Sequence, residues 1–505
     1  MRFRILLATV ALLGSLCAAC SSDEHCATGA LMDIADSYVR ADQNDQALQI
    51  AQTIDNSVIK ANVLSRIAVK YGEAGQENQA EALFTQALQM ANKIESLPEK
   101  AVTLETIATR YGKVGQNDKA AEVLSQASQV ANTIGGASFV KDTVIETIAV
   151  RYAEIGDYNQ GIGLANTIED SLPKSRALAR IVVKYVAVGN YDEARQIADT
   201  IEFNASKANA LIEIAKKTKE YEQALSAAKE IENEQAELKI NILGKISLLY
   251  AEAQQKQQTI EALSQALQVV KTTKDTETQV SQLAKIALLY LKTGNQQQAS
   301  NIFSQVLQVA DTIGNPEKKA NTLAKVAVAY ADAGQKKQAT LVFTQAQKVA
   351  QTIENDENKN NTLVRLAIAS TKIKPYDQVL QLTQTLRDTR VQSSALIQIA
   401  NDYVQAGHRD LAAKVLTQVL QNVQTLEDTD DKDQKLDQIA VQYAKITQYE
   451  QAIAVAKKIR TTNNGSPKAS VLAKIANSYV EAGQKDKAME VLSQALQVAK
   501  GTKCL

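Results

Sequence analysis

Residues 64–87 read LSRIAVKYGEAGQENQAEALFTQA, and this stretch decides the fold. Leu64, Ala68 and Tyr71 are separated by four and then three residues, which places them on one face of an α-helix. Gly75 follows the tyrosine by four residues, and a glycine there indicates a left-handed residue that ends the helix. After this glycine, Ala80, Phe84 and Ala87 are again separated by four and then three residues. The stretch therefore predicts two amphipathic helices joined by a tight turn.

The phrase that ends in Tyr71 recurs along the chain. Each copy has Leu or Ile seven residues before its last position and, in most copies, Ala three residues before it. The last positions are Tyr38, Tyr71, Tyr111, Tyr152, Tyr185, Thr218, Tyr250, Tyr290, Tyr330, Ser370, Tyr403, Tyr443 and Tyr479. A fixed repeat of this kind predicts a stack of helical hairpins that share one continuous core, rather than separate globular domains.

The second helix of the hairpin is expected in two lengths. Successive last positions lie 40 or 41 residues apart in some copies and 32 or 33 in others. The difference of about seven residues corresponds to two helical turns of ~3.6 residues each, so the apolar face stays in phase. We expect the long second helices to exceed the short ones by ~10 Å. Three consecutive short copies, around Tyr152, Tyr185 and Thr218, predict a notch along one edge of the stack.

The hairpin resembles the tetratricopeptide repeat. The residues that carry the resemblance are Leu64, Ile67, Ala68, Tyr71, Gly75, Ala80, Phe84 and Ala87. It covers roughly residues 28–500, although the chain has no Trp and no regular Pro after the second helix. The resemblance implies an all-α, right-handed α-solenoid of about thirteen helix-turn-helix repeats and a role in protein–protein interaction. HEAT-like and other helical-pair solenoids remain open as the geometric subtype.

Composition and motifs argue against other classes of function. Lys plus Arg and Asp plus Glu number 56 each, so no basic excess indicates nucleic acid. The two histidines and four cysteines form no metal-binding pattern, and no phosphate loop or nucleophile elbow is present. His408 lies in a hairpin turn next to Arg409 and Asp410, where a solvated residue is a simpler interpretation than a catalytic base. We expect no enzyme, no catalytic residue, no metal and no small-molecule cofactor.

The N-terminus predicts export. Arg2 and Arg4 precede a short apolar run over residues 5–16, which is the length of a signal-peptide core and too short to span a bilayer. Small residues before Cys20 resemble the lipobox of bacterial lipoproteins, although Cys17 occupies a place where that motif usually has Leu. The resemblance implies acylation of Cys20, and the following Ser21 implies outer-membrane sorting in a Gram-negative cell. The alternative is a plain cleaved signal that gives a soluble periplasmic protein.

These features divide the chain into a signal peptide (1–19), a lipidated linker (20–30), a repeat solenoid (31–500) and a C-terminal tail (501–505). We expect Cys26 and Cys504 at opposite ends of a stack on the order of 100 Å long, with ~8–10 Å between packed helices. An intrachain disulfide needs Cα atoms within about 7 Å, so we expect none between these two cysteines.

A row of aliphatic residues is the candidate binding site. It stands two residues before the last position of the repeat and comprises Val69, Val150, Val183, Leu248, Leu288, Val328 and Ile368. In the tetratricopeptide family the matching position faces the concave groove that holds peptides. Two interpretations remain open: the row lines an apolar groove for a partner segment, or it packs against the first helix of the next repeat.

The sequence thus favours a non-enzymatic interaction scaffold or adaptor of the bacterial cell envelope. Its expected partners are other proteins or peptides, and its N-terminal lipid anchor would hold it to a membrane. The alternative is a structural spacer that organises the envelope without a specific ligand.

Overall fold

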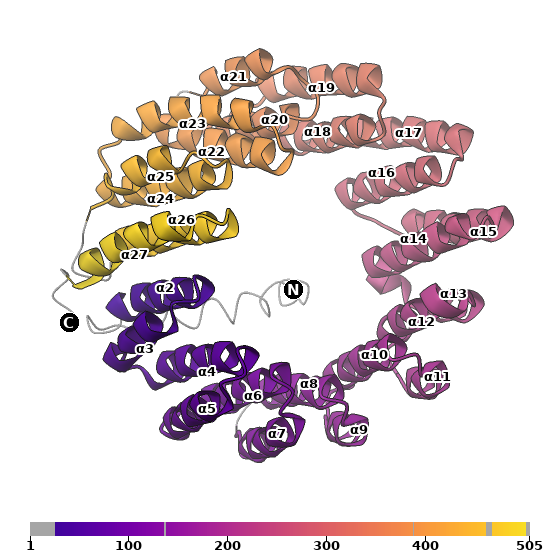
Figure 1. Cartoon of the computed structure of the whole chain (residues 1–505). Coiled ribbons are helices and arrows are strands. Elements are labelled where there is room, and N and C mark those ends of the chain that lie inside the picture. Colours follow the sequence, from indigo (N-terminus) through magenta and orange to yellow (C-terminus); the bar gives the residue numbers. More distant parts are fainter. Residues whose placement is uncertain (1–25, 136–137, 387, 461–466, 501–505) are drawn as a thin grey trace. The chain divides into compact units, whose positions relative to one another are not determined.

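The computed structural model describes residues 26–135, 138–386, 388–460 and 467–500 (Figure 1). This part contains 26 α-helices and one short 3₁₀-helix, η1 (Asn233–Gln235), and no strand. The α-helices pair into thirteen hairpins, which confirms the all-α solenoid predicted from the repeat. Each hairpin consists of a first helix, with an even number, and a second helix, with an odd number.

The first helices are 15 to 17 residues long and carry the repeated apolar face, which ends in Tyr in eleven of the thirteen. They are α2 (Cys26–Arg40), α4 (Ser57–Glu73), α6 (Leu97–Lys113), α8 (Ser138–Glu154), α10 (Ser171–Ala187), α12 (Asn204–Thr218), α14 (Ala236–Glu252), α16 (Thr276–Lys292), α18 (Pro316–Asp332), α20 (Asp356–Ser370), α22 (Thr389–Gln405), α24 (Thr429–Lys445) and α26 (Pro467–Glu481).

The second helices occur in two lengths, as the spacing predicts. The long ones all have 16 residues: α5 (Glu77–Asn92), α7 (Asn117–Asn132), α15 (Lys256–Lys271), α17 (Gln296–Asp311), α19 (Lys336–Gln351), α23 (Arg409–Gln424) and α27 (Lys485–Lys500). The short ones have 8 to 10 residues: α3 (Asn44–Thr53), α9 (Tyr158–Asn166), α11 (Tyr191–Asp199), α13 (Glu222–Lys229), α21 (Tyr376–Gln384) and α25 (Tyr449–Ala456).

The helical array begins earlier than the sequence suggested. Helix α2 begins at Cys26, so residues 26–30, which we assigned to the linker, belong to the first hairpin. The reason is packing, because Ala30 is only 5% exposed and continues the buried face of Leu31 and Ile34.

The core uses the positions that the repeat marks. The residue seven places before the last position of each repeat is buried in every hairpin, with at most 9% exposure at Leu363. The residue three places before the last position is 0% exposed in all thirteen hairpins. This holds also for Val182 and Ser247, which replace the usual Ala. Small side chains there let neighbouring helices approach closely, since a long side chain in a close-packed interior would force strain.

The turn between the two helices has one recurring geometry. In the eleven hairpins that have the tyrosine, its carbonyl oxygen accepts a hydrogen bond from the N–H five residues later, as in Gln76 to Tyr71 at 2.8 Å and His408 to Tyr403 at 2.8 Å. The residue before that N–H is left-handed, with φ of 72° at Gly75. In three hairpins a residue other than glycine, Asp42, Gln254 or Thr447, has this conformation, with φ of 60°, 59° and 66°. The sequence pattern did not indicate this. The bond from C″ to C3 of the helix explains this strict spacing.

Contacts divide the chain into two compact units, which we describe separately. The central unit comprises residues 96–426 and holds the nine hairpins from α6–α7 to α22–α23. Within it the first helices form an inner layer and the second helices an outer layer (Figure 1). Consecutive first helices contact one another directly, so their side chains form one continuous inner surface.

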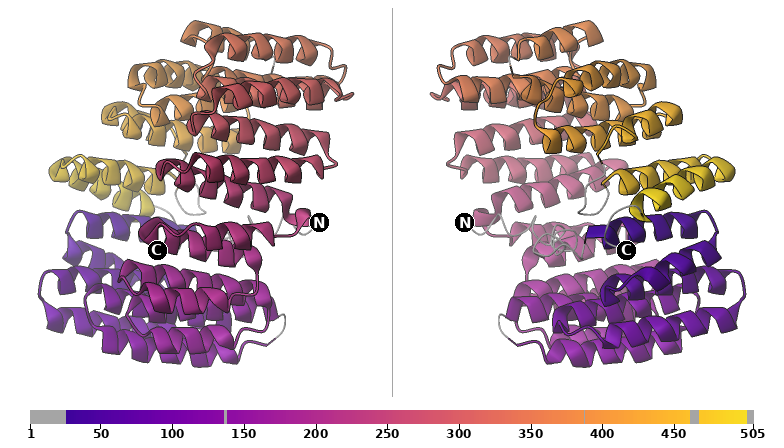
Figure 2. Two further views of the ribbon diagram at one scale, coloured as in Figure 1. Left: turned by 90° about the vertical axis from the view of Figure 1, so that its right-hand side faces the viewer. Right: turned by 90° about the vertical axis from the view of Figure 1, so that its left-hand side faces the viewer.

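The terminal unit comprises residues 1–95 and 427–505 and contains both ends of the helical array. Helix α2 packs against α26 and α27, and Figure 2 shows these hairpins next to each other. Ser37 donates a hydrogen bond to the carbonyl oxygen of Ala473 at 3.3 Å. Lys485 contacts the Asp42 carboxylate at 2.6 Å, and this hydrogen bond lowers the pKa of Asp42.

The expectation that the ends of the array lie far apart was therefore wrong. Cys26 begins the helix that packs against the last hairpin, while Cys504 lies outside the described residues. The contact is of the same kind as between successive repeats, because a first helix packs against both helices of the preceding hairpin. The first hairpin takes the place that a fourteenth repeat would occupy.

The turn geometry predicts opposite effects of glycine at matched positions. Thr447→Gly should raise the free energy of unfolding by ~1 kcal/mol, because a left-handed β-branched residue is strained. Gly75→Ala should lower it by about the same amount, although a Cβ there meets nothing within 4 Å. Urea unfolding monitored by circular dichroism measures both changes.

Gly163→Ala is the control, because Gly163 lies inside α9 with an ordinary φ and open space around it. There alanine should stabilise the helix by ~0.5–1 kcal/mol. An equal loss of stability at Gly75 and Gly163 would contradict the left-handed turn.

Candidate functional site

The predicted aliphatic row separates into two groups. Val69 and Val150 are 9% and 1% exposed, so the chain itself covers them and they support the packing interpretation. Val183 is 39% exposed. The other four, Leu248, Leu288, Val328 and Ile368, are half-buried and reach the surface of the inner layer. A binding role for these five side chains stays a prediction.

The four half-buried residues belong to a larger pattern on α14, α16, α18 and α20. Each of these consecutive first helices presents four residues at the same places, and each place recurs after 40 residues. The rows are acidic (Glu237, Glu277, Glu317, Glu357), amide or hydroxyl (Asn241, Ser281, Asn321, Asn361), basic (Lys245, Lys285, Lys325, Arg365) and aliphatic (Leu248, Leu288, Val328, Ile368). Intervals of four, four and three residues put all four on one side of the helix. We call this surface the four-row face.

Ion pairs connect neighbouring helices across the four-row face. Lys285 on α16 contacts Glu237 on α14 at 3.3 Å, with the two side chains 45% and 52% exposed. Arg365 on α20 lies 3.9 Å from Glu317 on α18. Such exposed pairs typically contribute ~0–1 kcal/mol, so a ligand carboxylate can compete for these bases at small cost.

The other two bases have no carboxylate partner in the described part of the chain. Lys245 donates to the side-chain oxygen of Asn209 at 3.1 Å. Lys325 has no described hydrogen bond or ion pair, because Glu277 is paired instead with Lys318 at 2.8 Å. That hydrogen bond raises the pKa of the Lys318 amine above its ordinary value.

A cavity lies between α16 and α18 within this face. Its volume is about 120 Å³, and its apolar lining includes Val280, Ala284, Leu288 and Val326. Three charged residues, Glu277, Lys285 and Lys325, line it as well. Since a cavity of ~150 Å³ lined by aliphatic side chains binds benzene, this one has room for an aliphatic side chain of a partner.

One polar atom near the cavity has an unused hydrogen-bonding capacity. The Asn321 side-chain oxygen is buried and has no hydrogen-bond partner among the described residues. Asn321 stands one helical turn before Lys325, and its neighbour Thr322 lines the cavity. An unsatisfied buried acceptor of this kind costs ~1–3 kcal/mol of folding stability.

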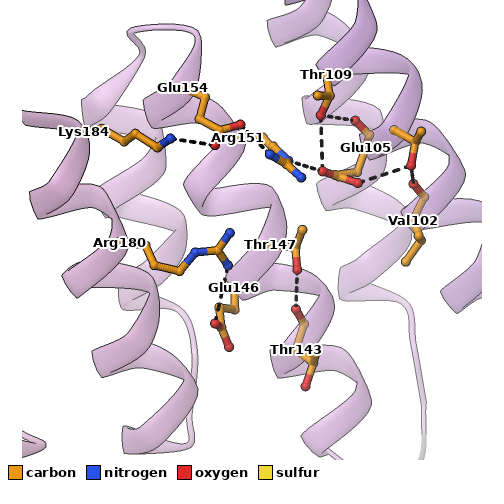
Figure 3. A network of polar contacts seen from close by, with 11 residues as sticks. Val102, Glu105, Thr109, Thr143, Glu146, Thr147, Arg151, Glu154, Arg180 and Lys184 are labelled. Carbon is orange, nitrogen blue, oxygen red and sulfur yellow. Dashed lines mark hydrogen bonds and ion pairs between the residues drawn. The ribbon is translucent and has the colours of Figure 1, made fainter. Parts of the chain in front are cut away.

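The inner layer at α6, α8 and α10 has a different character (Figure 3). Glu105 on α6 is only 6% exposed and pairs with Arg151 on α8. Arg151 also contacts Glu154 at 2.5 Å, which in turn contacts Lys184 on α10 at 2.8 Å. Figure 3 shows these side chains directed toward one another across the three helices. Their charges are satisfied within the chain, so this network binds neighbouring repeats together.

The environment of the network shifts the pKa values of its members. Burial acts to lower the pKa of Arg151, but the carboxylates of Glu105 and Glu154 outweigh it and raise the value. Burial likewise acts to raise the pKa of Glu154, and the bonds from Lys184 and Arg151 hold it below its ordinary range. Both shifts favour the charged forms, as in a structural ion-pair network.

Other candidate residues add no site. Cys20 lies outside the described residues, so its acylation stays a prediction. The described residues contain no group of three His, Cys, Asp or Glu side chains placed to hold a metal. His408 is exposed at the hairpin turn, where its backbone N–H bonds to the carbonyl of Tyr403.

Sequence analysis found the aliphatic row and missed the three rows beside it. Their signal was present, because four consecutive repeats show the same residue types at 40-residue intervals. Within a single repeat, charged residues between core positions resemble an ordinary solvated face. The rows become visible only when the four repeats are compared at the 40-residue interval.

Comparison with known proteins agrees with the helical-repeat architecture. The family model of the tetratricopeptide repeat matches residues 469–502, which form the last hairpin. No curated protein matches the chain by sequence. The hairpins and this match together support a tetratricopeptide-like solenoid.

Three solved structures are among those to which the chain is similar. Ton1535 from Thermococcus onnurineus NA1 has 18% identity and a TM-score of 0.29, over 73% of this chain and 98% of that one. A STAND protein with a tetratricopeptide repeat sensor, PH0952 from Pyrococcus horikoshii, has 13% identity and a TM-score of 0.25, over 90% and 65%. The APC/C hetero-tetramer Cut9–Hcn1 has 12% identity and a TM-score of 0.24, over 92% of each chain. At such scores these likenesses carry no functional argument.

The ion-pair network predicts unequal costs for two arginines. Arg151→Met should lower the free energy of unfolding by ~3 kcal/mol, because it leaves the buried Glu105 carboxylate without its counter-charge. Arg180→Met should cost ~0.5 kcal/mol or less, since Arg180 is 47% exposed and 3.7 Å from Glu146. Chemical unfolding of the two variants measures the difference.

The double variant Glu105→Leu with Arg151→Met tests the cause. Removing both charges should restore most of the lost stability, because no buried charge remains unpaired. A double variant as unstable as Arg151→Met alone would show that the arginine acts through packing instead.

Proposed function

We propose that this protein is a non-enzymatic interaction scaffold that binds a segment of another protein on its four-row face. The observation that carries the proposal is the partial exposure of Leu248, Leu288, Val328 and Ile368 on one surface, where Leu288 also lines the cavity between α16 and α18. Arrays of tetratricopeptide-like repeats suggest protein–protein interaction as the general role, and the described residues show no cluster suited to metal chemistry.

Energetics support binding at this face. Aliphatic side chains that line an open surface gain from being covered, at roughly 25 cal/mol per Å² of apolar area removed from water. The neighbouring basic and amide rows supply directional contacts that fix the register of a bound segment. Val69 and Val150 hold the same position elsewhere and are already covered by the chain, so they offer no such gain.

We further propose that the scaffold works in the bacterial cell envelope, tethered through an acylated Cys20. The basic start, the apolar run over 5–16 and the small residues before Cys20 support this placement. Among the described helices, none has both the length and the apolar composition needed to cross a membrane. Outer-membrane sorting in a Gram-negative cell goes with Ser21, and a soluble periplasmic form is the alternative.

Lipidation is tested by metabolic labelling with palmitate in the expressing bacterium. The wild-type chain should incorporate label and sediment with membranes, since several buried acyl methylenes at ~0.8 kcal/mol each hold it there. Cys20→Ser should lose both label and sedimentation, whereas Cys26→Ser should keep both. If the wild-type protein is unlabelled and stays in the soluble fraction, the signal peptide is cleaved without acylation of Cys20.

Partner binding is tested by photo-crosslinking in cells with a crosslinking amino acid at Ser281. A scaffold should give a few defined products, whereas a structural spacer without a ligand should give only abundant neighbours. The same group at Gln338, on the outer helix α19, is the matched control and should not give those products.

Replacing Leu248, Leu288 and Val328 together by Ser should abolish these crosslinks while the protein stays folded. Val150→Ser separates binding from stability, because Val150 is 1% exposed and lies in the same row of a distant hairpin. It should lower the melting temperature by a few degrees, on the order of 2–4 °C per kcal/mol, and keep the crosslinks. Crosslinks that survive the triple change would refute this binding face.

A further inference from the structure

The four-row face repeats the same residue types from helix to helix, and we infer that its partner segment repeats too. The geometry points to an extended polyproline-II segment with one acidic and one aliphatic residue in every three. The acidic residues face the basic row, and the aliphatic ones face the row of Leu248, Leu288, Val328 and Ile368. This inference rests on the proposed function, because it specifies the chemistry of the segment bound at that face.

The repeat distance selects the backbone conformation. Helices α14, α16, α18 and α20 contact one another in sequence, and packed helices lie ~8–10 Å apart. Three residues of polyproline II advance ~9.3 Å and return to the same side of the segment. Three residues of a β-strand advance ~10 Å but point to opposite sides, so every second helix would meet the wrong side chain.

Charge and row spacing select the side chains. The basic and aliphatic rows are three residues apart on each helix, which is ~4.5 Å along its axis, so neighbouring side chains of one segment reach both. Lys245 and Lys325 have no described carboxylate partner, and the pair of Lys285 with Glu237 is half exposed. On one helix the acidic row lies eight residues from the basic row, or ~12 Å. Across helices Glu237 and Glu317 reach Lys285 and Arg365, so an acidic segment displaces these two carboxylates when it binds.

The cavity gives the segment an apolar anchor at its centre. An aliphatic side chain over α16 and α18 enters the cavity of about 120 Å³ beside Leu288. The site thus combines one apolar anchor with a ladder of weaker charge contacts.

Repetition on both sides predicts that affinity depends on the number of ligand repeats. Each added triplet binds the next helix as an intramolecular step, so affinity rises with length until four helices are covered. The test uses fluorescein-labelled peptides that contain two, four or six copies of Glu-Leu-Pro. Fluorescence anisotropy with the purified full chain at low and moderate salt measures the dissociation constants.

We expect the four-copy peptide to bind at least about tenfold more tightly than the two-copy peptide, and six copies to add little. A shuffled peptide of the same composition should bind at least about tenfold more weakly than the four-copy one. Equal affinity for the ordered and shuffled peptides, or no gain from two copies to four, would overturn the inference.

Charge reversal supplies a second test, in which a gain of binding to a new peptide shows that the variant is still folded. Lys285→Glu with Lys325→Glu should weaken binding of the Glu-Leu-Pro peptide and create binding of a Lys-Leu-Pro peptide. Lys336→Glu with Lys337→Glu makes the same charge change on the outer helix α19 and should leave both peptides unaffected. Unchanged peptide preference in the inner-face variant would refute the basic row as the recognition element.

The outcomes separate this inference from the proposed function. If the triple Ser variant loses its crosslinks in cells but the repeated peptides do not bind, the face binds a segment of other chemistry. If the triple Ser variant keeps its crosslinks, the binding face itself is wrong, whatever the peptides show.

Discussion

The whole array depends on one constraint, the absence of space at the residue three places before the end of each repeat phrase. That residue is fully buried in all thirteen hairpins, and it is Ala in eleven of them. Helices that meet at alanine come close enough to make contacts along their whole length. The dispersion attraction of each contact is weak, but together these contacts stabilise the packed helices. The leucine four residues earlier and the tyrosine three residues later complete a contact face that each hairpin offers to its neighbours.

Because these three positions make the contacts between hairpins, the other positions of each first helix can vary. In α6, α8 and α10 the variable positions carry charges that interlock across helices through Glu105, Arg151 and Glu154. In α14, α16, α18 and α20 the same surface carries uniform rows that remain accessible. The same core therefore carries one stretch whose charges are paired across helices and another stretch with uniform, accessible rows.

Much of the fold follows from local sequence because every hairpin obeys the same local rules. The number of hairpins, the two lengths of the second helix and the turn glycines were all predictable from spacing alone. Asp42, Gln254 and Thr447 were not recognised as left-handed residues, because the hydrogen bond to the preceding Tyr carbonyl imposes that conformation even where the side chain disfavours it. The burial of Val69 and Val150 was equally hidden, since it depends on how closely the next hairpin approaches.

The contact between α2 and the last hairpin could not be inferred from any single repeat. Repeat arrays generally need end repeats with a polar outer side, which keeps the stack soluble and prevents further growth. In the terminal unit α2 packs against α26 and α27, so each end of the array covers the other. The order of neighbours in this unit, α24–α25, α26–α27, α2–α3 and α4–α5, therefore runs across both ends of the array without a break.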